Sequence, residues 1–472
     1  MLIATLEDGQ LVLRWNIFQT FFGCKRPALR LPIENILCIR TSDKGLSEPW
    51  KGVRSLGLHI PRWAAVGSFR GVMRPTWEYW NVVGNPNVVE VFLRKGDPYS
   101  RVLVNVPAPR ELIDSIVARH PTPDFVDGDY RAPSQEVCLT VKGRTVRGTI
   151  TYPEVPGHYP AVLFIQGSGA TDRDWNSKAL PGTNGSAALL ANQLARKGVV
   201  TLRYDKCGIG DNKLPEGGLS WTDYSNEQSA MLEHLAKFEY VDNRRVMVLG
   251  HSEGTMHAMR LCRELPAGLG VVGLILMAPP GRPLQEVIRA QLGPQFRKLP
   301  MSVVYSDETA REELERLDRG FESIRRGVPL TAEELRLGLA ARKIYNKFFD
   351  PRARAFSREL LPFDPRVEIG RIPIPVLILC GGKDLQIHPV DDAQVLVEAA
   401  AKIGKEDVSI RILDDADHVF KYEETPRDKL SPISGLEYNA ANRILDPQVV
   451  PAISRWLYEL IPELQPGPVL RT

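Results

Sequence analysis

The chain has 472 residues, of which 43% are hydrophobic and 25% are charged. This length is enough for two or three domains with a buried core, and the composition is typical of a soluble globular protein. The formal net charge is only +3, which argues against nucleic acid or a membrane surface as the partner. The excess of positive charge lies in the first 120 residues, which hold 16 Lys or Arg against 10 Asp or Glu.

The sequence indicates a cytoplasmic protein that needs no cofactor and no metal. The N-terminal stretch MLIATLEDGQLVLRW has no basic segment followed by an apolar core, so we expect no signal peptide. No apolar run reaches the length that spans a membrane. The cysteines form no C-x-x-C pair and are expected to be buried thiols of a reducing compartment, at Cys24, Cys38, Cys138, Cys207, Cys262 and Cys380.

Residues 1–120 are predicted to form a small β-rich domain closed by one helix. Four segments alternate apolar and polar residues or are rich in β-branched ones, namely ATLEDGQLVLRW, ENILCIRTS, VVEVFLRKG and YSRVLVNV. A helical segment follows at 107–117, with Leu112, Ile113, Ile116 and Val117 on one face. This pattern, with SLGLHIPRWAAVGSFRG and EYWNVVGNPNVVEVFL, resembles bacterial pleckstrin-homology-like domains. The resemblance implies a small β-barrel or sandwich without catalytic residues, and its protein partner is unknown.

Residues 121–135, PTPDFVDGDYRAPSQ, are rich in Pro and Asp and have no periodicity, so we interpret them as a linker. Nothing in the sequence places the domain before this linker near a catalytic residue.

Residues 136–472 are predicted to form an α/β domain. EVCLTVKG and TVRGTITY resemble a hairpin, and the next strands are short and apolar: AVLFI, VVTLRY, VMVLG, VGLILMAP, IPVLILC and VSIRILDD. Helical segments lie between them, including GSAALLANQLARKG, SNEQSAMLEHLAKF and VDDAQVLVEAAAKIG. This alternation predicts a mostly parallel sheet with helices on both faces.

The alternation stops at about residues 281–365, where an all-helical insertion is predicted. Helical spacing relates Leu314, Leu317, Phe321 and Ile324. A capping box of Thr331 and Glu334 is expected to open a second helix that runs through Leu335, Leu339 and Phe348. An insertion at this point of such a sheet could form a lid over a site at the strand ends. The alternative is a helical excursion that touches no ligand.

The motif Gly-x-Ser-x-Gly occurs as Gly250-His251-Ser252-Glu253-Gly254. It lies between the predicted strand VMVLG and the predicted helix TMHAMRLCREL, which is the arrangement of a nucleophile elbow. The tight turn tolerates only glycine at neighbouring positions and lifts the serine hydroxyl clear of the backbone. Ser252 is therefore the candidate nucleophile.

A serine hydroxyl needs a positioned base, and the base needs an orienting acid. In the order expected for this fold, serine then acid then histidine, three histidines follow Ser252. His418, in the loop after VSIRILDD, is favoured. His257 is pinned beside the elbow, and His388 is the rival, with a surface position before Pro389 as its alternative interpretation.

The predicted acid is Asp384 in CGGKD, directly after IPVLILC, because two glycines permit a turn toward the histidine loop. The competing carboxylates are Asp414, Asp415 and Asp417, whose D-D-x-D pattern is more typical of a turn.

An oxyanion intermediate needs backbone donors. The amide of Glu253 is one candidate. The second should come from the loop after AVLFI, with Ser168 preferred and Gly167 as the alternative. Asp172, Arg173 and Asp174 in this loop have no assigned role, since such clusters often bond their own loop.

From about residue 136 to 460 the chain resembles the α/β-hydrolase superfamily and, within it, a bacterial esterase group. The matching stretches are QGSGATDRD, RYDKCGIG, GHSEG, GGKD and DADH. The resemblance implies Ser252, Asp384 and His418 as the triad, and hydrolysis of carboxylic esters of small or medium acyl groups. The sequence departs from the group's usual residues at Gln166, Ala170, Cys207 and Thr255. These changes affect the oxyanion loop and hence the substrate range. Cys207 itself is expected to be a structural thiol.

The predicted function is therefore that of a serine esterase acting on a small-molecule ester through an acyl-enzyme. The same machinery could act on thioesters or peptides, or could transfer acyl groups. From a different class, the chain could be a binding protein with an inert hydrolase domain.

Overall fold

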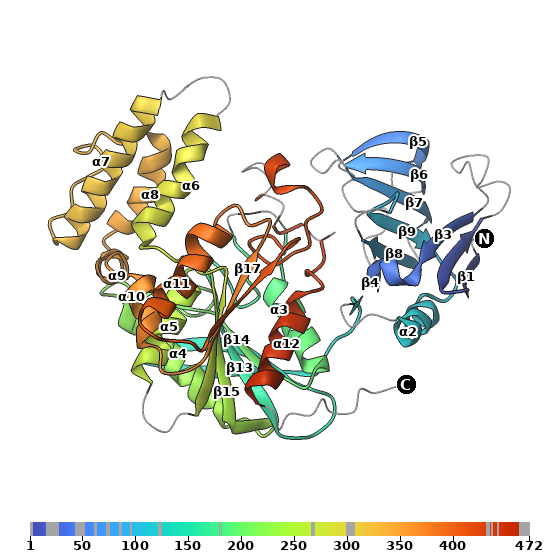
Figure 1. The fold of residues 1–472 in the computed structure, drawn as a ribbon, viewed down its shortest axis with the longest axis horizontal. Helices are drawn as coiled ribbons and strands as arrows, with labels where there is room; N and C mark the ends of the chain where they lie inside the picture. Colours follow the sequence, from blue (N-terminus) through green and yellow to red (C-terminus); the bar gives the residue numbers. More distant parts are fainter. Residues whose placement is uncertain are drawn as a thin grey trace.

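The computed structural model describes residues 3–461 apart from 16–27, 43–51, 61–63, 72–75, 85–86, 95–96, 121–124, 179, 181, 266–269, 299–306, 431–434, 436–437 and 441–442. The described residues therefore leave out Cys24, parts of the predicted linker and insertion, and residues 61–63, 85–86 and 95–96 of the predicted β-rich segments. Two β-sheets near the N-terminus stand beside a larger α/β unit (Figure 1).

The N-terminal region consists of two sheets and one helix, which enclose a core of their own. The first sheet has the order β1-β2-β3 and the second the order β10-β4-β8-β9-β7-β6-β5. The apolar core includes Leu11, Leu13, Ile39, Val91 and Val102, and helix α2 closes it with Ile113 and Ile116. The strands are β1 (Ile3–Glu7), β2 (Gln10–Arg14), β3 (Ala28–Pro32), β4 (Ile36–Thr41), β5 (Gly52–Ile60), β6 (Ala64–Gly71), β7 (Trp77–Val83), β8 (Val88–Leu93), β9 (Arg101–Asn105) and β10 (Val126–Asp127), and the helix is α2 (Pro109–Arg119).

The third sheet has eight strands in the order β11-β12-β14-β13-β15-β16-β17-β18. The pairs β11–β12 and β12–β14 are antiparallel, and every later pair is parallel. The predicted hairpin is present, because Lys142 and Gly143 both have positive φ and form the tight turn that right-twisted strands prefer. The strands are β11 (Ser134–Val141), β12 (Arg144–Thr151), β13 (Tyr159–Ile165), β14 (Val200–Tyr204), β15 (Val241–His251), β16 (Val271–Met277), β17 (Val376–Gly381) and β18 (Val408–Leu413).

Helices cover both faces of this sheet, as the strand–helix alternation predicts (Figure 1). Helices α3 (Ser186–Arg196) and α12 (Val449–Leu460) contact each other on one face, and Trp456 of α12 packs against Gly273 of β16. Helices α4 (Trp221–Ala236) and α5 (Gly254–Glu264) pack together on the other face, and α11 (Val395–Lys402) covers β18. Ser220 and Asp223 form a capping box that begins α4 earlier than the apolar pattern alone indicated.

In its described part the insertion consists of helices joined by turns and contains no strand, and it packs around its own core of Leu317, Phe321 and Tyr345. One prediction is wrong in detail. Thr331 and Glu334 do form reciprocal capping bonds, at 2.6 and 3.2 Å, but they close a turn because Arg336 has a φ of 52°. The next helix begins only at Leu339. The helices are α6 (Leu284–Lys298), α7 (Asp307–Arg325), α8 (Leu339–Phe349), α9 (Arg354–Leu360) and α10 (Pro365–Glu368).

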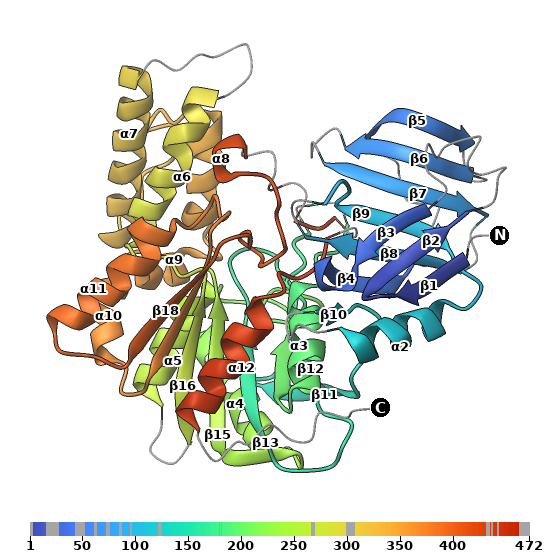
Figure 2. The same ribbon diagram turned by 45° about the vertical axis from the view of Figure 1, so that its right-hand side comes forward.

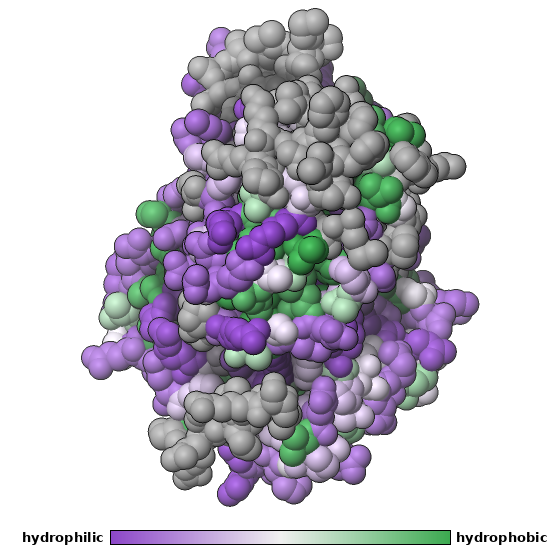
Figure 3. Space-filling model, turned by 90° about the vertical axis from the view of Figure 1, so that its right-hand side faces the viewer, coloured by the Kyte–Doolittle hydropathy of each residue, from purple (hydrophilic) through white to green (hydrophobic). Residues whose placement is uncertain are grey.

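The N-terminal sheets and the helices α6–α8 stand on opposite sides of the α/β unit (Figures 1 and 2). In both views, the chain after β18 passes between the two N-terminal sheets and the eight-stranded sheet. On the outward face of the N-terminal side, apolar residues gather at the centre with hydrophilic residues around them (Figure 3). No helix in the described part of the chain is long and apolar enough to cross a membrane.

Candidate active site

Ser252 lies in the sharp turn between β15 and α5. Its φ is 54°, which is uncommon for a residue with a side chain, and its amide donates to the Met277 carbonyl oxygen at 2.9 Å. A side chain on Gly254 would collide with the backbone at the end of β13, and one on Gly250 would collide with the first turn of α5. The two glycines of the motif are therefore required by close backbone approach, and the serine between them is held in a strained conformation.

Asp384 and His418 are brought together from the ends of β17 and β18. Asp384 is fully buried, and its Oδ1 accepts the amides of Gln386 and Ile387 at 2.7 and 2.9 Å. Its Oδ2 lies 2.8 Å from Nδ1 of His418. Because a carboxylate can only accept, Nδ1 carries the proton and Nε2 is left as the basic nitrogen of the neutral ring.

The pKa of His418 is raised above its ordinary value. Burial of the ring opposes this shift, but the charge of Asp384 and the hydrogen bond from Nδ1 outweigh it. The imidazole is thus more basic than its buried position alone would allow.

His251, which precedes Ser252, ties the elbow to the histidine loop. Its Nε2 donates to the carbonyl oxygen of His418 at 2.8 Å, and its ring stacks on Trp175 with centroids 4.4 Å apart. Burial lowers the pKa of His251 to about 3, so this ring is neutral at physiological pH. His251 therefore joins the two loops as an uncharged hydrogen-bond donor.

The loop after β13 passes directly over Ser252. A Cβ built on Gly167 would lie 3.1 Å from Cβ of Ser252. The buried Nζ of Lys206 donates to the Gly167 carbonyl oxygen. In a trans peptide the carbonyl and the following N–H point in opposite directions, so this bond turns the Ser168 amide the other way. No loop or side-chain acceptor in the described part of the chain takes the amide of Ser168 or Glu253.

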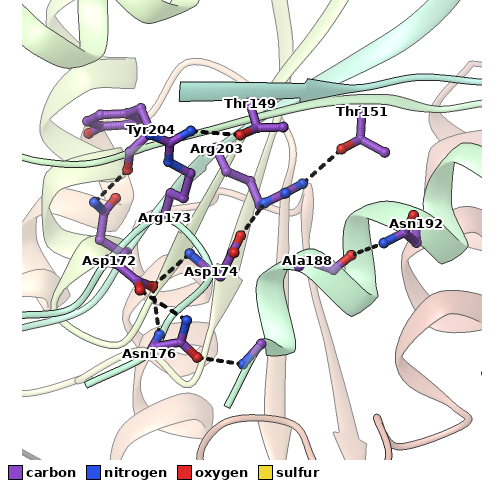
Figure 4. A network of polar contacts seen from close by, with 12 residues as sticks. Thr149, Thr151, Asp172, Arg173, Asp174, Asn176, Ala188, Asn192, Arg203 and Tyr204 are labelled. Carbon is purple, nitrogen blue, oxygen red and sulfur yellow. Dashed lines mark hydrogen bonds and ion pairs between the residues drawn. The ribbon is translucent and has the colours of Figure 1, made fainter. Parts of the chain in front are cut away.

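The charged residues after this loop bond within the protein (Figure 4). Asp172 accepts the amides of Asp174 and Asn176 at 3.0 and 2.9 Å. Asp174 pairs with Arg203 at 2.9 Å, and Arg173 reaches Asp205 at 2.8 Å. Asp172 thus bonds its own loop, as expected for a cluster of this kind, whereas Arg173 and Asp174 tie the loop to Asp205 and Arg203.

The rival residues have other partners. His257 is buried, stacks on Phe356 and lies 3.6 Å from Glu253. His388 is 43% exposed and caps the helical turn that begins at Pro389, by accepting the Val390 and Asp391 amides. Neither ring is bonded to Asp384.

Of the competing carboxylates, Asp417 forms a buried ion pair with Arg443, Asp415 lies 3.6 Å from Lys383, and the backbone of Asp414 packs on Gly382. The predicted turn is present, and Asp417 bonds the amides of Val419 and Lys421 within it, but this carboxylate is buried and ion-paired.

The departures from the esterase pattern have structural partners. Gln166 donates from Nε2 to the Tyr204 carbonyl oxygen at 2.8 Å, and Thr255 bonds the Ser252 carbonyl oxygen at 2.7 Å. Burial raises the pKa of Cys207 to about 12, so this thiol is not an activated nucleophile. The sequence pattern assigned no role to Lys206, although a lysine two residues after the buried strand β14 could have indicated one.

The chain is similar to several known proteins. Residues 162–432 match the model of the Alpha/beta hydrolase family. Esterase EstD of Thermotoga maritima is 30% identical over 71% of this chain and 69% of its own length. The 2,6-dihydropseudooxynicotine hydrolase of Paenarthrobacter nicotinovorans is 27% identical over 27% of this chain and 31% of its own. The solved proline iminopeptidase of Mycobacterium smegmatis superimposes with a TM-score of 0.42 at 15% identity, covering 70% of this chain and 98% of its own.

Proposed function

The chain belongs to the Alpha/beta hydrolase family, and on that premise we propose that it is a serine hydrolase that cleaves carboxylic esters. The observation that carries the proposal is the buried Asp384–His418 hydrogen bond beside the strained elbow of Ser252. Similarity to an esterase over more than two thirds of both chains favours an ester as the substrate.

In the proposed first step, Nε2 of His418 takes the proton of the Ser252 hydroxyl as its oxygen attacks the ester carbonyl carbon. The carbon–oxygen double bond opens to an oxyanion. When the intermediate collapses, the alcohol leaves with the proton that His418 returns, and the acyl group stays on Ser252. Water, activated by the same imidazole, then attacks the acyl-enzyme and releases the acid.

The amides of Ser168 and Glu253 are the proposed donors to the oxyanion, with Gly167 as the alternative to Ser168. Support comes from their uncommitted N–H groups and from the bond between Lys206 and the Gly167 carbonyl. Donors that are held in place before the reaction begins stabilise the developing charge without reorganisation.

We propose the helical insertion at 281–365 as a lid. Gln291 of α6 donates to the Gln386 carbonyl oxygen at 3.1 Å, and the amide of Gln386 bonds Asp384. The insertion therefore borders the loop of the proposed acid. We further propose a division into an N-terminal domain (1–120), a linker (121–135) and a catalytic domain (136–472). Within the linker, Val126 and Asp127 pair with β4, and Ser134 and Gln135 already belong to β11. Limited proteolysis between Pro121 and Gln135 would test the division.

The proposed activity is tested by a panel of p-nitrophenyl esters of increasing chain length, with thioester and peptide substrates in parallel. Ser252→Ala is the control for background hydrolysis. We expect ester turnover that disappears in the variant. Preferential turnover of thioesters or peptides would reassign the substrate. No turnover, together with no labelling by a fluorophosphonate probe, would indicate a binding protein with an inert hydrolase domain.

A further inference from the structure

His418 lies in a loop beyond the edge of the α/β sheet. The histidine loop (residues 414–423) follows β18, which is the last strand in the sheet order, so the sheet supports it from one side only. The loop is closed by a bridge between Ala416 and Tyr422 and by the Glu423 amide on the Asp415 carbonyl at 2.7 Å. Phe420 within it has a φ of 59°, so this tight loop contains a strained residue.

A second stretch of chain braces this loop. In the brace segment (residues 443–446), the Ile444 carbonyl accepts the Tyr422 amide at 3.0 Å, and the Asp446 amide bonds the Phe420 carbonyl at 2.8 Å. Arg443 forms the buried ion pair with Asp417, next to His418, and also bonds the Tyr422 carbonyl at 2.9 Å.

Asp417 completes the brace from within the loop. Its Oδ1 accepts the amides of Val419 and Lys421 at 3.0 and 2.9 Å. One carboxylate thus links Arg443 to both sides of the tip of the loop. The position of His418 therefore depends on the position of the brace segment.

The outer face of the brace is covered by the N-terminal sheet. Ile444 is only 5% exposed and belongs to one apolar cluster with Leu37 and Cys38 of β4 and Phe92 of β8. Tyr422 packs against the same cluster. A cavity of about 50 Å³ lies at this junction and is lined from both sides, including by Arg101 and Arg443.

The pKa of a buried lysine also indicates that the histidine loop lies close to the N-terminal sheet. Burial lowers the pKa of Lys421 to about 7, and the positive charges of Arg443 and of Arg40 on β4 act in the same direction. The histidine loop therefore lies within electrostatic range of the N-terminal sheet.

The connection between the domains is also anchored at both ends. Val126 of β10 pairs with Cys38 of β4, and Nε2 of Gln193 on α3 donates to the Asp127 carbonyl at 3.2 Å. The Ala132 amide bonds Asn192 of the same helix at 2.8 Å. The contact with the brace segment is thus part of a fixed junction (Figure 2).

We infer that the N-terminal domain is a positioning element for His418: the surface formed by Leu37, Cys38 and Phe92 holds the brace segment, and the brace segment holds the histidine loop. The expected effect on ester kcat rests on the proposed function, whereas the expected effect on the position of the histidine loop does not. A domain that only recruited a partner would leave the loop unchanged when its surface is altered.

The test uses the full chain with substitutions on either side of the junction. Phe92→Ala and Ile444→Ala each remove apolar contact from the shared cluster, and Phe92→Leu is the conservative variant expected to restore it. Ile60→Ala is the matched control, because Ile60 is 39% exposed on β5, at the opposite edge of the same sheet. Circular dichroism confirms that each variant is folded.

Hydrogen exchange followed by mass spectrometry reads the loop without reference to activity. The amides of Asp417, Lys421 and Tyr422 are hydrogen-bonded in the intact protein. In Phe92→Ala and Ile444→Ala they should exchange faster, on the order of tenfold, while the peptide with Ser252 is unchanged. Unaltered exchange in both variants would overturn the inference.

Kinetics then tests the catalytic consequence. Displacing a catalytic group by a fraction of an ångström costs roughly 10- to 100-fold in rate, so ester kcat and probe labelling should fall while KM changes little. The double variant Phe92→Ala with Ile444→Ala should lose less than the product of the single losses, because both remove one contact. Faster amide exchange in the histidine loop together with a normal kcat would also overturn the inference. If the intact protein turns over no ester, the proposed function fails, and hydrogen exchange alone decides the inference.

Discussion

The nucleophile elbow and the histidine loop are held in opposite ways. The elbow is fixed by neighbours in the central sheet, since Ser252 bonds Met277 at the end of β16 and Gly254 packs against the end of β13. The histidine loop lies beyond the edge strand and depends on residues 443–446 and on the N-terminal sheet. One half of the site is held by neighbouring strands of the same sheet, and the other half by chain segments that lie outside that sheet.

This difference predicts different effects for substitutions of the reacting groups and for substitutions of the residues that hold them. Substitution of a reacting group should lower activity to a similar extent whether the group lies in the elbow or in the histidine loop. Substitutions in the surroundings should differ, because the elbow has little freedom to relax whereas the histidine loop can move away from Asp384.

The largest effects are expected for the reacting groups. Ser252→Ala and His418→Ala should each lower kcat by about 10⁴- to 10⁶-fold, because triad members act as a unit, and Asp384→Asn should cost somewhat less. Steady-state ester hydrolysis measures these losses. Near-normal activity in Asp384→Asn combined with a large loss in Asp417→Asn would show that the acid has been assigned wrongly.

Lys206→Met tests the support on the elbow side. Without the ammonium group, the peptide between Gly167 and Ser168 loses the bond that turns its N–H toward the proposed oxyanion. We expect a fall in kcat approaching the roughly 10²- to 10³-fold cost of one oxyanion donor, with KM little changed. The exposed Lys213→Met is the matched control. Equal activity in the two variants would show that Lys206 does not position the Ser168 amide.

Arg443→Met tests the support on the histidine side. It leaves Asp417 buried without its partner, which should destabilise the protein by about 3–5 kcal/mol and lower kcat on the order of tenfold. Denaturant unfolding and ester kinetics measure the two effects. Adding Asp417→Asn should recover part of the stability, since the unpaired charge is then gone. A double variant as unstable as the sum of the single ones would argue against a coupled pair.

The smallest expected effect is a shift in pH dependence. Activity requires neutral His418, so it should rise with pH through the pKa of that ring, which the intact protein holds above its ordinary value. Asp384→Asn removes the carboxylate that stabilises the protonated form and leaves burial, which lowers the pKa. The rising limb of kcat/KM should therefore move to lower pH in the residual activity of this variant. A limb that stays in place would mean that it reports another group.

The two regions also differ in how far the sequence could predict them. Short apolar strands such as β13 and β17 and the turn after β15 follow from local patterns, so the candidate residues at their ends could be named. The second helix of the insertion was misplaced because the left-handed Arg336 interrupts a segment whose capping box is otherwise regular. Arg443 and the junction at Phe92 could not be found, since no local pattern states which distant segment covers a loop.

The central claim is that Ser252 is an activated nucleophile, and mapping the adduct of a fluorophosphonate probe tests it most directly. We expect one phosphonylated peptide, which contains Ser252 and forms much more slowly in His418→Ala. Absence of an adduct from the folded protein, or an adduct on a residue other than Ser252, would contradict it.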